Sequence, residues 1–519
     1  MLRPDHIGVV VSAALAAGAI GVLSGCSVFS SLPFIEWPGE DRDDLDVREA
    51  AGLEDPLPWW ESFDDPVLNR VVEAVLESNY DLATAVARVE QARAKARIAT
   101  AARMPRIQAS LGAVGFDAPT NVGLGAQLEE LGLGADAFTA FGFSLPDRLD
   151  QTTYSAGADV AYEVDFWGRD RNAALSAVAQ REAYHADYRA ARMGVVVQTV
   201  ATYVEIVDLY RQRGFAGETV EILHDWVTLA EDRYDRGVGD VRDVYALRRN
   251  LADAQASLPG LDERLADAEG RLRVLLGGHQ HAGLVGTLTD SMPASTMAPA
   301  PMGVPAEALA QRPDVAAARQ RLAAARFGLD ARRAALLPSL SLSGSIGLQS
   351  PDTGAWFDPD QWFRNLSSNL LAPVFQGGRL RGNVALAEAE LAEAAAMYGH
   401  AVAKATAEVQ AALAALESNV DRLALLNSFA EEAGAEAMLQ EERYASGVGD
   451  YRTFLAASQM SVGAKAARAA GERDLTYARL GLHRALGGAW SSVAAGPTPP
   501  STAMLVRQLK LPRERAEGE

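Results

Sequence analysis

The stretch EDRYDRGVGDVRDV, residues 231–244, decides the fold because the chain contains it twice. Its counterpart is EERYASGVGDYRTF at residues 441–454, and the shared core Arg-Tyr-x-x-Gly-Val-Gly-Asp recurs at an offset of 443 − 233 = 210 residues. Leu-Gly-Gly at 276–278 and Gly-Arg at 168–169 also return 210 residues later. Three landmarks with a single offset indicate a duplicated architecture.

Long helices are expected on both sides of each repeated stretch. Residues 169–236 contain no proline and few glycines, which predicts one helix of about 100 Å at 1.5 Å per residue. A second helix is expected to run back to Leu276, and residues 379–446 and 450–486 repeat the pair. Helices of this length need neighbours along their whole length, as in coiled coils.

The repeated motif itself predicts a tight reversal between two helices. Gly237 and Gly447 can adopt the left-handed conformation that ends a helix, and Asp240 and Asp450 can cap the helix that returns. The residues singled out at the two turns are Arg233, Tyr234, Gly237, Gly239 and Asp240, with Arg443, Tyr444, Gly447, Gly449 and Asp450.

A shorter helix is expected near the start of each half. Residues 67–103 have helical spacing, with Asp65 as N-cap, and Pro105 ends the pattern. The counterpart, residues 314–335, ends at Pro338. Because 338 − 105 = 233 rather than 210, the first half holds 23 extra residues between Pro105 and Gly168.

Alternation of apolar with small polar residues predicts one strand hairpin in each half. The strands are expected at 107–113 and 154–162, at 339–348 and, less cleanly, at 362–375. Such runs are typical of transmembrane barrel strands, although a soluble half-buried hairpin gives the same pattern. The 23 extra residues fall in the hairpin loop. The expected junctions between strands and helices are Pro105, Gly168, Pro338 and Gly378.

The only cysteine, Cys26, follows a short basic start and an apolar stretch at 7–23. Leu-Ser-Gly-Cys at 23–26 resembles the bacterial lipoprotein signal, in which the cysteine becomes the lipidated first residue after cleavage. An ordinary signal peptide with an incidental cysteine is the alternative. Ser27 at the next position favours sorting to the outer membrane. Residues 27–65, with the aromatic cluster of Trp59, Trp60 and Phe63, are expected to be extended chain packed on the outside of a larger body.

Composition excludes several classes of function. A net charge of −20 argues against a nucleic-acid partner, and across a pore it would favour cations. The sequence has no phosphate-binding loop, no nucleophile elbow and no His-Glu-x-x-His, so neither an enzyme nor a cofactor or metal site is expected. One His pair, His279 and His281, lies in a Pro/Gly-rich linker, where solvated histidines are common.

Four strands are too few to close a barrel in a membrane. The mature chain has no apolar run of about 20 residues, so any insertion must use strands. The smallest familiar barrels have about eight strands, and open edges in lipid are costly. The need to close the barrel therefore predicts an oligomer, and a trimer would supply twelve strands.

With these motifs the chain resembles the TolC-like outer-membrane efflux channels, in their lipoprotein branch. The resemblance is carried by WESFDDPVLN at 60–69, PVFQGGR at 373–379 and both Arg-Tyr-x-x-Gly repeats. It implies a mainly α fold with membrane β: a homotrimer whose twelve-stranded outer-membrane barrel continues into a periplasmic α-helical barrel. The implied partners are outer-membrane lipid, a periplasmic membrane-fusion adaptor and an inner-membrane pump of the resistance-nodulation-division type.

The resemblance implies a passive exit channel for small molecules such as drugs, in a tripartite efflux pump. Two alternatives are a duct for type I protein secretion and a periplasmic adaptor lipoprotein without a pore. The two turns would be the periplasmic entrance and the surface on which the adaptor docks.

One feature departs from the family pattern at the entrance. In relatives, aspartates six and nine residues after the second-half glycine narrow the opening, but here those positions are Thr453 and Ala456. The first half keeps Asp243 at the equivalent place. Asp243 could form an acidic ring across three copies, or simply occupy a favourable first helical turn.

The expected organisation follows the duplication. The segments are a signal peptide at 1–25, a lipidated extended segment at 26–65, a first repeat at 66–278, a linker at 279–311, a second repeat at 312–488 and a partly disordered tail at 489–519.

Overall fold

The computed structural model describes residues 58–119, 148–278, 282–286, 288, 292–293, 306–352, 354 and 358–488. Cys26, the signal peptide, the His pair and the tail lie outside these residues. The elements in chain order are η3 (Trp59–Phe63), α3 (Pro66–Ser78), α4 (Tyr80–Ala101), β1 (Arg106–Pro119), β2 (Arg148–Val164), α7 (Arg169–Asp235), α8 (Val241–Leu275), α9 (Ala282–Val285), α10 (Ala306–Gln311), α11 (Pro313–Ala334), β3 (Ser339–Ser350), η6 (Pro359–Gln361), β4 (Trp362–Leu371), α12 (Arg379–Ala445) and α13 (Tyr451–Ala485).

The duplication is present in the helix boundaries. α7 and α12 both have 67 residues and α8 and α13 both have 35, and each pair begins and ends 210 positions apart. α4 and α11 both have 22 residues. The predicted long helices are confirmed to within one or two residues at each end.

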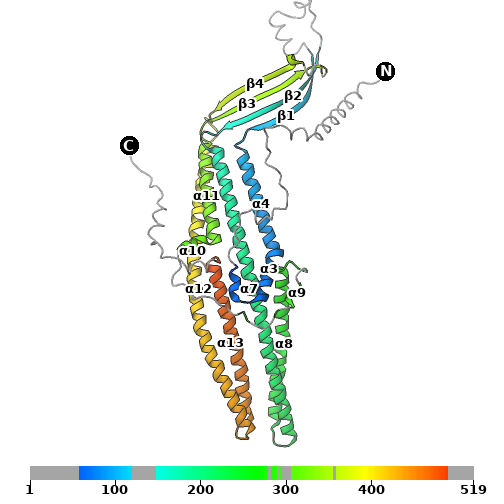
Figure 1. Cartoon of the computed structure of the whole chain (residues 1–519), viewed down its shortest axis with the longest axis vertical. Coiled ribbons are helices and arrows are strands. Elements are labelled where there is room, and N and C mark those ends of the chain that lie inside the picture. The colour runs from blue at the N-terminus through cyan, green and yellow to red at the C-terminus, as the bar shows by residue number, and fades with distance from the viewer. Residues whose placement is uncertain are drawn as a thin grey trace, which may run out of the picture. The chain divides into compact units, whose positions relative to one another are not determined.

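α7 is the central helix of the packing. It contacts α3, α4, α8, α11 and α13, while α12 contacts α11 and α13 (Figure 1). Near the sheet the helices therefore follow the order α4, α7, α11, α12, and towards the turns the pairs α7–α8 and α12–α13 lie next to each other.

The largest apolar clusters surround the middle of α7. Val200, Tyr203 and Val204 are fully buried against η3 and α3, and Ile206 and Leu209 against α3 and α8. α7 is also the one described helix long and apolar enough to cross a membrane by length and composition, but half of its most apolar window is buried inside the chain. That burial is typical of a core helix.

The expectation of extended chain around the N-terminal aromatic cluster is wrong for the described part. Trp59, Trp60 and Phe63 form a 3-10 turn and are at most 7% exposed. The Trp59 ring stacks on His483 of α13 with centroids 4.8 Å apart. The cluster thus joins the start of the first repeat to the end of the second.

The single helix predicted over 67–103 is also wrong, because it is divided at Asn79. Asn79 Oδ1 accepts from the backbone N–H groups of Asp81 and Leu82 and caps α4. Its Nδ2 donates to the carbonyl of Leu275 at 3.0 Å. The apolar spacing continues through Asn79, so periodicity alone does not reveal the break. The cap at the start of α3 is confirmed: Asp65 Oδ1 accepts from Val67 N.

The four strands form one antiparallel sheet in the order β1-β2-β3-β4. The two predicted hairpins are joined through β2 and β3, where Ala158 pairs with Ile346. β1 and β2, with 14 and 17 residues, are longer than the alternation predicts. β4 ends at Leu371, four residues before the predicted Phe375.

Candidate functional site

The sheet has one polar and one apolar face. Directly paired residues share a face of an antiparallel sheet. The polar face carries Gln108, Ser110, Ser155, Asp159, Ser343, Ser345, Asn365 and Ser367, and the opposite face carries Ile107, Leu111, Val160, Tyr162, Leu342, Ile346, Leu366 and Leu370. The faces are mixed at the end of the sheet far from the helices, where Val114, Phe116 and Phe363 lie on the polar face and Asp117, Asp150 and Arg364 on the apolar face. On the polar face the Ser343 and Ser367 hydroxyl oxygens are 2.7 Å apart.

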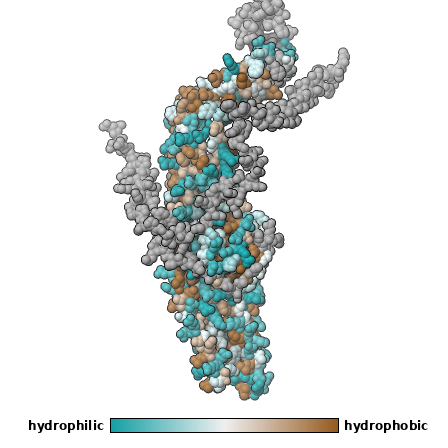
Figure 2. Space-filling view, viewed as in Figure 1, coloured by the Kyte–Doolittle hydropathy of each residue, from teal (hydrophilic) through white to brown (hydrophobic). Residues whose placement is uncertain are grey.

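The apolar face is exposed although its side chains are large. Leu366 is 86% exposed, Ile107 68% and Ile346 53%. Figure 2 shows hydrophobic residues along the sheet and at its junction with the helices. Exposed apolar patches of this kind mark a surface that meets another apolar phase or molecule. β1 and β4 each have only one strand partner among the described residues, so both edges of the sheet are open.

The four predicted junction residues lie between strands and helices. Pro105 and Pro338 immediately precede β1 and β3. Gly168 and Gly378 are the N-cap residues of α7 and α12, with φ of 75° and 82°, a conformation that other residues rarely adopt. The two halves also meet here, because Trp167 Nε1 donates to the carbonyl of Pro338 at 2.8 Å.

The two turns between the long helices have the same hydrogen-bond pattern. Gly237 N donates to Tyr234 O at 2.8 Å and Val238 N to Arg233 O at 2.9 Å. Gly447 N donates to Tyr444 O and Val448 N to Arg443 O in the same way. With φ of 76° and 75° at the first glycines, this is the Schellman ending that requires glycine.

The second glycine of each turn is required by space rather than by φ. A Cβ on Gly239 would lie 2.9 Å from Tyr234 N, and one on Gly449 would lie 2.9 Å from Tyr444 N. The predicted caps differ between the repeats. Asp240 Oδ1 accepts from Arg242 N at 2.9 Å, whereas Asp450 holds the N-cap position without a side-chain cap bond.

An aromatic cluster, here called the tip cluster, joins the two helix pairs beside these turns. It consists of Trp226 of α7 with Tyr444, Tyr451 and Phe454 of the second repeat. The Trp226 ring centroid lies 5.5 Å from that of Tyr451, 5.3 Å from Phe454 and 5.8 Å from Tyr444. The Arg233 guanidinium lies 5.1 Å from the Tyr451 ring centroid. Tyr234, the counterpart of Tyr444, is 48% exposed and outside the cluster.

Asp243 is paired with a cation of the other repeat. Its carboxylate accepts a hydrogen bond from Arg452 of α13. The Arg452 guanidinium lowers the pKa of Asp243, and the Tyr451 hydroxyl acts in the same direction. Thr453 and Ala456 are exposed on α13. The acidic ring of Asp243 across three copies stays a prediction.

Sequence reasoning missed Trp226, Tyr451 and Arg452. The sequence signal for them is modest. Trp226 lies two helical turns before the first Arg-Tyr-x-x-Gly-Val-Gly-Asp motif, and Tyr451 and Arg452 directly follow the second. Trp226 and Tyr451 have no aromatic counterpart in the other half, whereas Arg452 is matched by Arg242, so the duplication does not point to the two aromatic residues.

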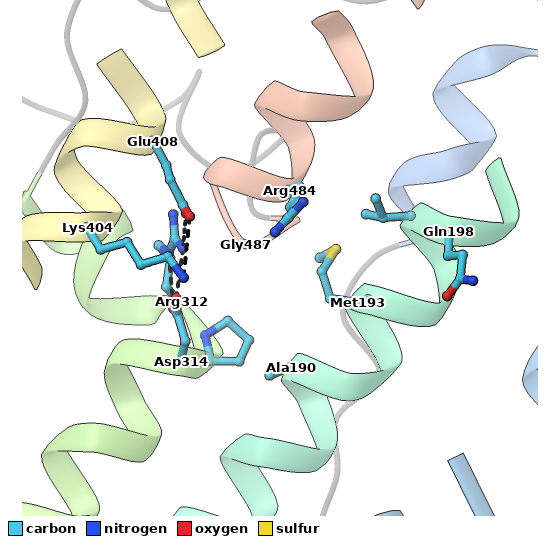
Figure 3. Close-up of a pocket in the computed structure, with 12 residues that line it drawn as sticks. Ala190, Met193, Gln198, Arg312, Asp314, Lys404, Glu408, Arg484 and Gly487 are labelled. Atoms are coloured by element: carbon cyan, nitrogen blue, oxygen red, sulfur yellow. Dashed lines mark hydrogen bonds and ion pairs between the residues drawn. The ribbon is translucent and has the colours of Figure 1, made fainter. Parts of the chain in front are cut away.

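A second group of charges joins the start of α11 to α12 and α13 within the second repeat. Arg312 is 5% exposed, and its guanidinium donates to Asp314 and to Glu408 of α12, the latter at 2.6 Å (Figure 3). It also donates to the carbonyl of Ala485 at 2.8 Å. It borders a pocket of about 490 Å³ that Met193 and Gln198 of α7 also line. Every donor of this group has a protein acceptor, which indicates a structural brace.

The described residues contain no candidate metal site. Within these ranges no group of three or more His, Cys, Asp or Glu side chains could hold a metal ion. The features that stand out are a two-faced open-edged sheet, long paired helices and two linked turns.

Comparison with known proteins identifies the family. The model of the outer membrane efflux protein family matches residues 71–278 and 304–488. The chain belongs to the outer membrane efflux protein family. It is 32% identical over 455 residues to the pyoverdine export outer membrane protein OpmQ of Pseudomonas putida, covering 86% of this chain and 91% of that one. It is 29% identical to the toluene efflux pump outer membrane protein TtgI of Pseudomonas putida, over 83% of this chain and 87% of that one.

The fold agrees with a solved efflux channel. The outer-membrane channel OprN superimposes with a TM-score of 0.72 at 29% identity, covering 83% of this chain and 92% of that chain. This outer membrane efflux protein therefore combines a β domain with long α-helices, as expected, and it is an outer-membrane transport component.

Proposed function

We propose that this outer membrane efflux protein is a passive homotrimeric exit channel of a tripartite pump, anchored to the outer membrane by a lipid on Cys26. Its partners would be a periplasmic membrane-fusion adaptor and an inner-membrane pump of the resistance-nodulation-division type. The observation that carries the proposal is the sheet with one polar face, one exposed apolar face and two open edges.

The need to close the sheet into a barrel supports an assembly of three copies. An open edge in hydrocarbon leaves backbone groups unpaired at a cost of several kcal/mol each. If β4 of each copy pairs with β1 of the next, three copies of the four-stranded sheet close a barrel of twelve strands. The apolar faces then meet lipid and the polar faces line the lumen.

The helices support a conduit that continues from the barrel. α7 and α12 are each about 100 Å long, which is far more than a membrane requires. In a ring of three copies they would form a wall, with the turns around Gly237 and Gly447 at its far end. We infer that these turns are the entrance and the adaptor-docking surface, and that the tip cluster with Asp243–Arg452 holds the entrance closed. Opening would require the helix pairs to separate.

Purification and reconstitution test the channel. The mature protein in detergent should have the mass of a trimer by native mass spectrometry, and it should conduct ions in a planar bilayer. A monomer that is soluble without detergent and does not conduct would contradict the proposal and favour a pore-less adaptor.

Deletion of the gene tests the cargo. The relatives carry the names of toluene and pyoverdine export proteins, which supports small organic molecules as cargo here. Loss of the gene should increase sensitivity to drugs or solvents and leave protein secretion unchanged. A secretion defect without a change in sensitivity would favour the type I secretion duct.

A further inference from the structure

The turn between β4 and α12 presents two apolar side chains with no cover. Val374 is 95% exposed and Phe375 is 87% exposed, the largest exposures among the big apolar residues of the described chain. Pro373 precedes them, and Gly377 and Gly378 follow with φ of 58° and 82°. Proline fixes its own φ, and the two glycines permit the left-handed backbone that the turn requires. The turn formed in this way leaves the phenyl ring of Phe375 facing solvent.

A groove of suitable chemistry lies at the opposite edge of the molecule. It has a volume of about 410 Å³ and lies between α4 and α7, close to the start of β1. Its walls are Ala96, Thr100 and Ala101 of α4, Met104 just after α4 and Val178 of α7, and the lining is completed by Arg93, Arg97 and Arg181. Methyl groups, a thioether and arginine side chains form a surface that accepts an aromatic ring by apolar and cation–π contact.

The direction of the strands brings the turn and the groove together. β4 runs towards the helices and ends at Leu371, and β1 starts at Arg106 and runs away from them. Continuing the antiparallel order from one copy to the next therefore puts the end of β4 beside the start of β1. The order of the helices leads to the same arrangement. α12, which follows the turn, and α4, which carries the groove, are at opposite ends of the series α4, α7, α11, α12, so α12 of one copy would lie beside α4 of the next.

We propose that Phe375 of each copy inserts into the groove between α4 and α7 of the next copy, with Val374 covering its rim. The inference rests on the proposed trimer and adds the contact that fixes adjacent copies where strands become helices. A β-ladder alone can slip in register, whereas a side chain in a fitted groove cannot. Burial of the ring also removes from water the most exposed aromatic side chain of the described residues.

Cysteine pairing tests the contact. In Phe375→Cys/Ala101→Cys, each copy links to the next and mild oxidation should give covalent dimers and trimers on a non-reducing gel. Phe375→Cys/Ala87→Cys is the matched control. Ala87 is exposed on the same helix but about 21 Å from Ala101, beyond the reach of a disulfide. The single variants reveal any contribution from Cys26.

Native mass spectrometry of the same samples separates the two proposals. A trimeric protein in which neither Ala101→Cys nor Thr100→Cys links to Phe375→Cys would overturn the groove contact and leave the channel standing. A protein that is monomeric before oxidation would overturn the channel itself.

Truncation of the ring provides an independent readout. Phe375→Ala should lower the temperature at which the trimer dissociates by several degrees, with unchanged helix content. Phe375→Leu, which keeps an apolar side chain, should restore part of the loss. Equal dissociation temperatures for all three proteins would overturn the proposal.

Discussion

Two kinds of interaction link the two repeats at their turns, an ion pair and a group of aromatic contacts, and they differ in their contribution to stability. The Asp243–Arg452 ion pair is open to solvent, with Arg452 63% exposed, and such pairs contribute about 0.2–1 kcal/mol. The tip cluster buries Trp226 and Tyr451, each under 9% exposed, and aromatic contacts add about 0.5–1.5 kcal/mol each beyond their burial. The link is thus mostly aromatic. Its total of a few kcal/mol is within the range that a binding partner can reverse.

Removing the cation should loosen the entrance. Arg452→Ala removes the cation that pairs with Asp243 across the repeats, so we expect an increased open probability in planar bilayers. Arg242→Ala is the matched control, because Arg242 pairs with Asp240 of its own turn, at 2.8 Å. Equal behaviour of the two variants would show that the pair across the repeats does not restrain the entrance. Mild acid should not imitate Arg452→Ala, because the lowered pKa keeps Asp243 charged until the pH falls below its ordinary value of 3.8.

His483 makes the aromatic cluster of η3 sensitive to acid. Burial lowers the pKa of His483 to about 4, whereas an unfolded histidine titrates near 6.5. The unfolded chain therefore binds the proton first, and stability should fall as the pH decreases from about 6.5 to about 4. At 1.36 kcal/mol per unit, the full loss is about 3 kcal/mol. Thermal unfolding followed by circular dichroism at pH 7.5 and 4.5 measures it. His483→Gln should show a smaller loss between these pH values; an unchanged slope would contradict the assignment.

At the scale of elements, each reversal depends on two glycines for different reasons. Gly447 supplies a positive φ, and Gly449 lets the chain pass close to Tyr444 N. Sequence reasoning predicts the first requirement from the position of Gly after a helix. The second requires the three-dimensional path of the turn.

Glycine-to-alanine substitutions should have different effects in these turns and inside a helix. Gly449→Ala brings a Cβ to 2.9 Å from a backbone nitrogen, so we expect it to destabilise the reversal by about 1–3 kcal/mol and to weaken adaptor binding. Gly214→Ala in α7, with no atom within 4 Å of its Cβ, should be neutral or stabilising by up to about 1 kcal/mol. The thermal unfolding midpoint and the affinity for the adaptor should be measured for both variants. If Gly449→Ala matched Gly214→Ala in both quantities, the close-approach argument would be refuted.

Helix existence is predictable from this sequence, but helix interruption is not. Repetition and the lack of proline locate α7, α8, α12 and α13 because a long helix is a local property. Asn79 divides the first helix because its side chain finds Leu275 O, 196 positions away. The 3-10 turn at Trp59–Phe63 likewise depends on contact with α7 and α13. Contacts across the repeats decide both features, and local periodicity contains no information about them.

For the whole molecule, the register of the sheet decides which charges face the proposed lumen. Asp159 is on the polar face, opposite Ser345 and Gln108, while Asp150 is on the other face, opposite Asp117. The alternation in sequence predicts two faces. Both faces of β4 are exposed in the single chain, so the assignment of the polar face to the lumen rests on polarity and on the proposed contact of Leu366 and its neighbours with lipid.

Ion selectivity tests this arrangement. Three Asp159 carboxylates in the lumen should attract cations, so Asp159→Asn should shift the reversal potential in a KCl gradient towards the unselective value. Asp150→Asn removes the same charge from the outer face and should change it little. Equal shifts for the two variants would contradict the assignment of the faces.

The matched lengths of the repeated helices have a consequence for stoichiometry. A ring of three copies would carry six turns of nearly the same backbone, which gives approximate sixfold symmetry at one end and strict threefold symmetry elsewhere. An adaptor that reads only the backbone could occupy six positions. One that reads the side chains would find two alternating classes, because Tyr234 is exposed where Tyr444 is packed into the tip cluster.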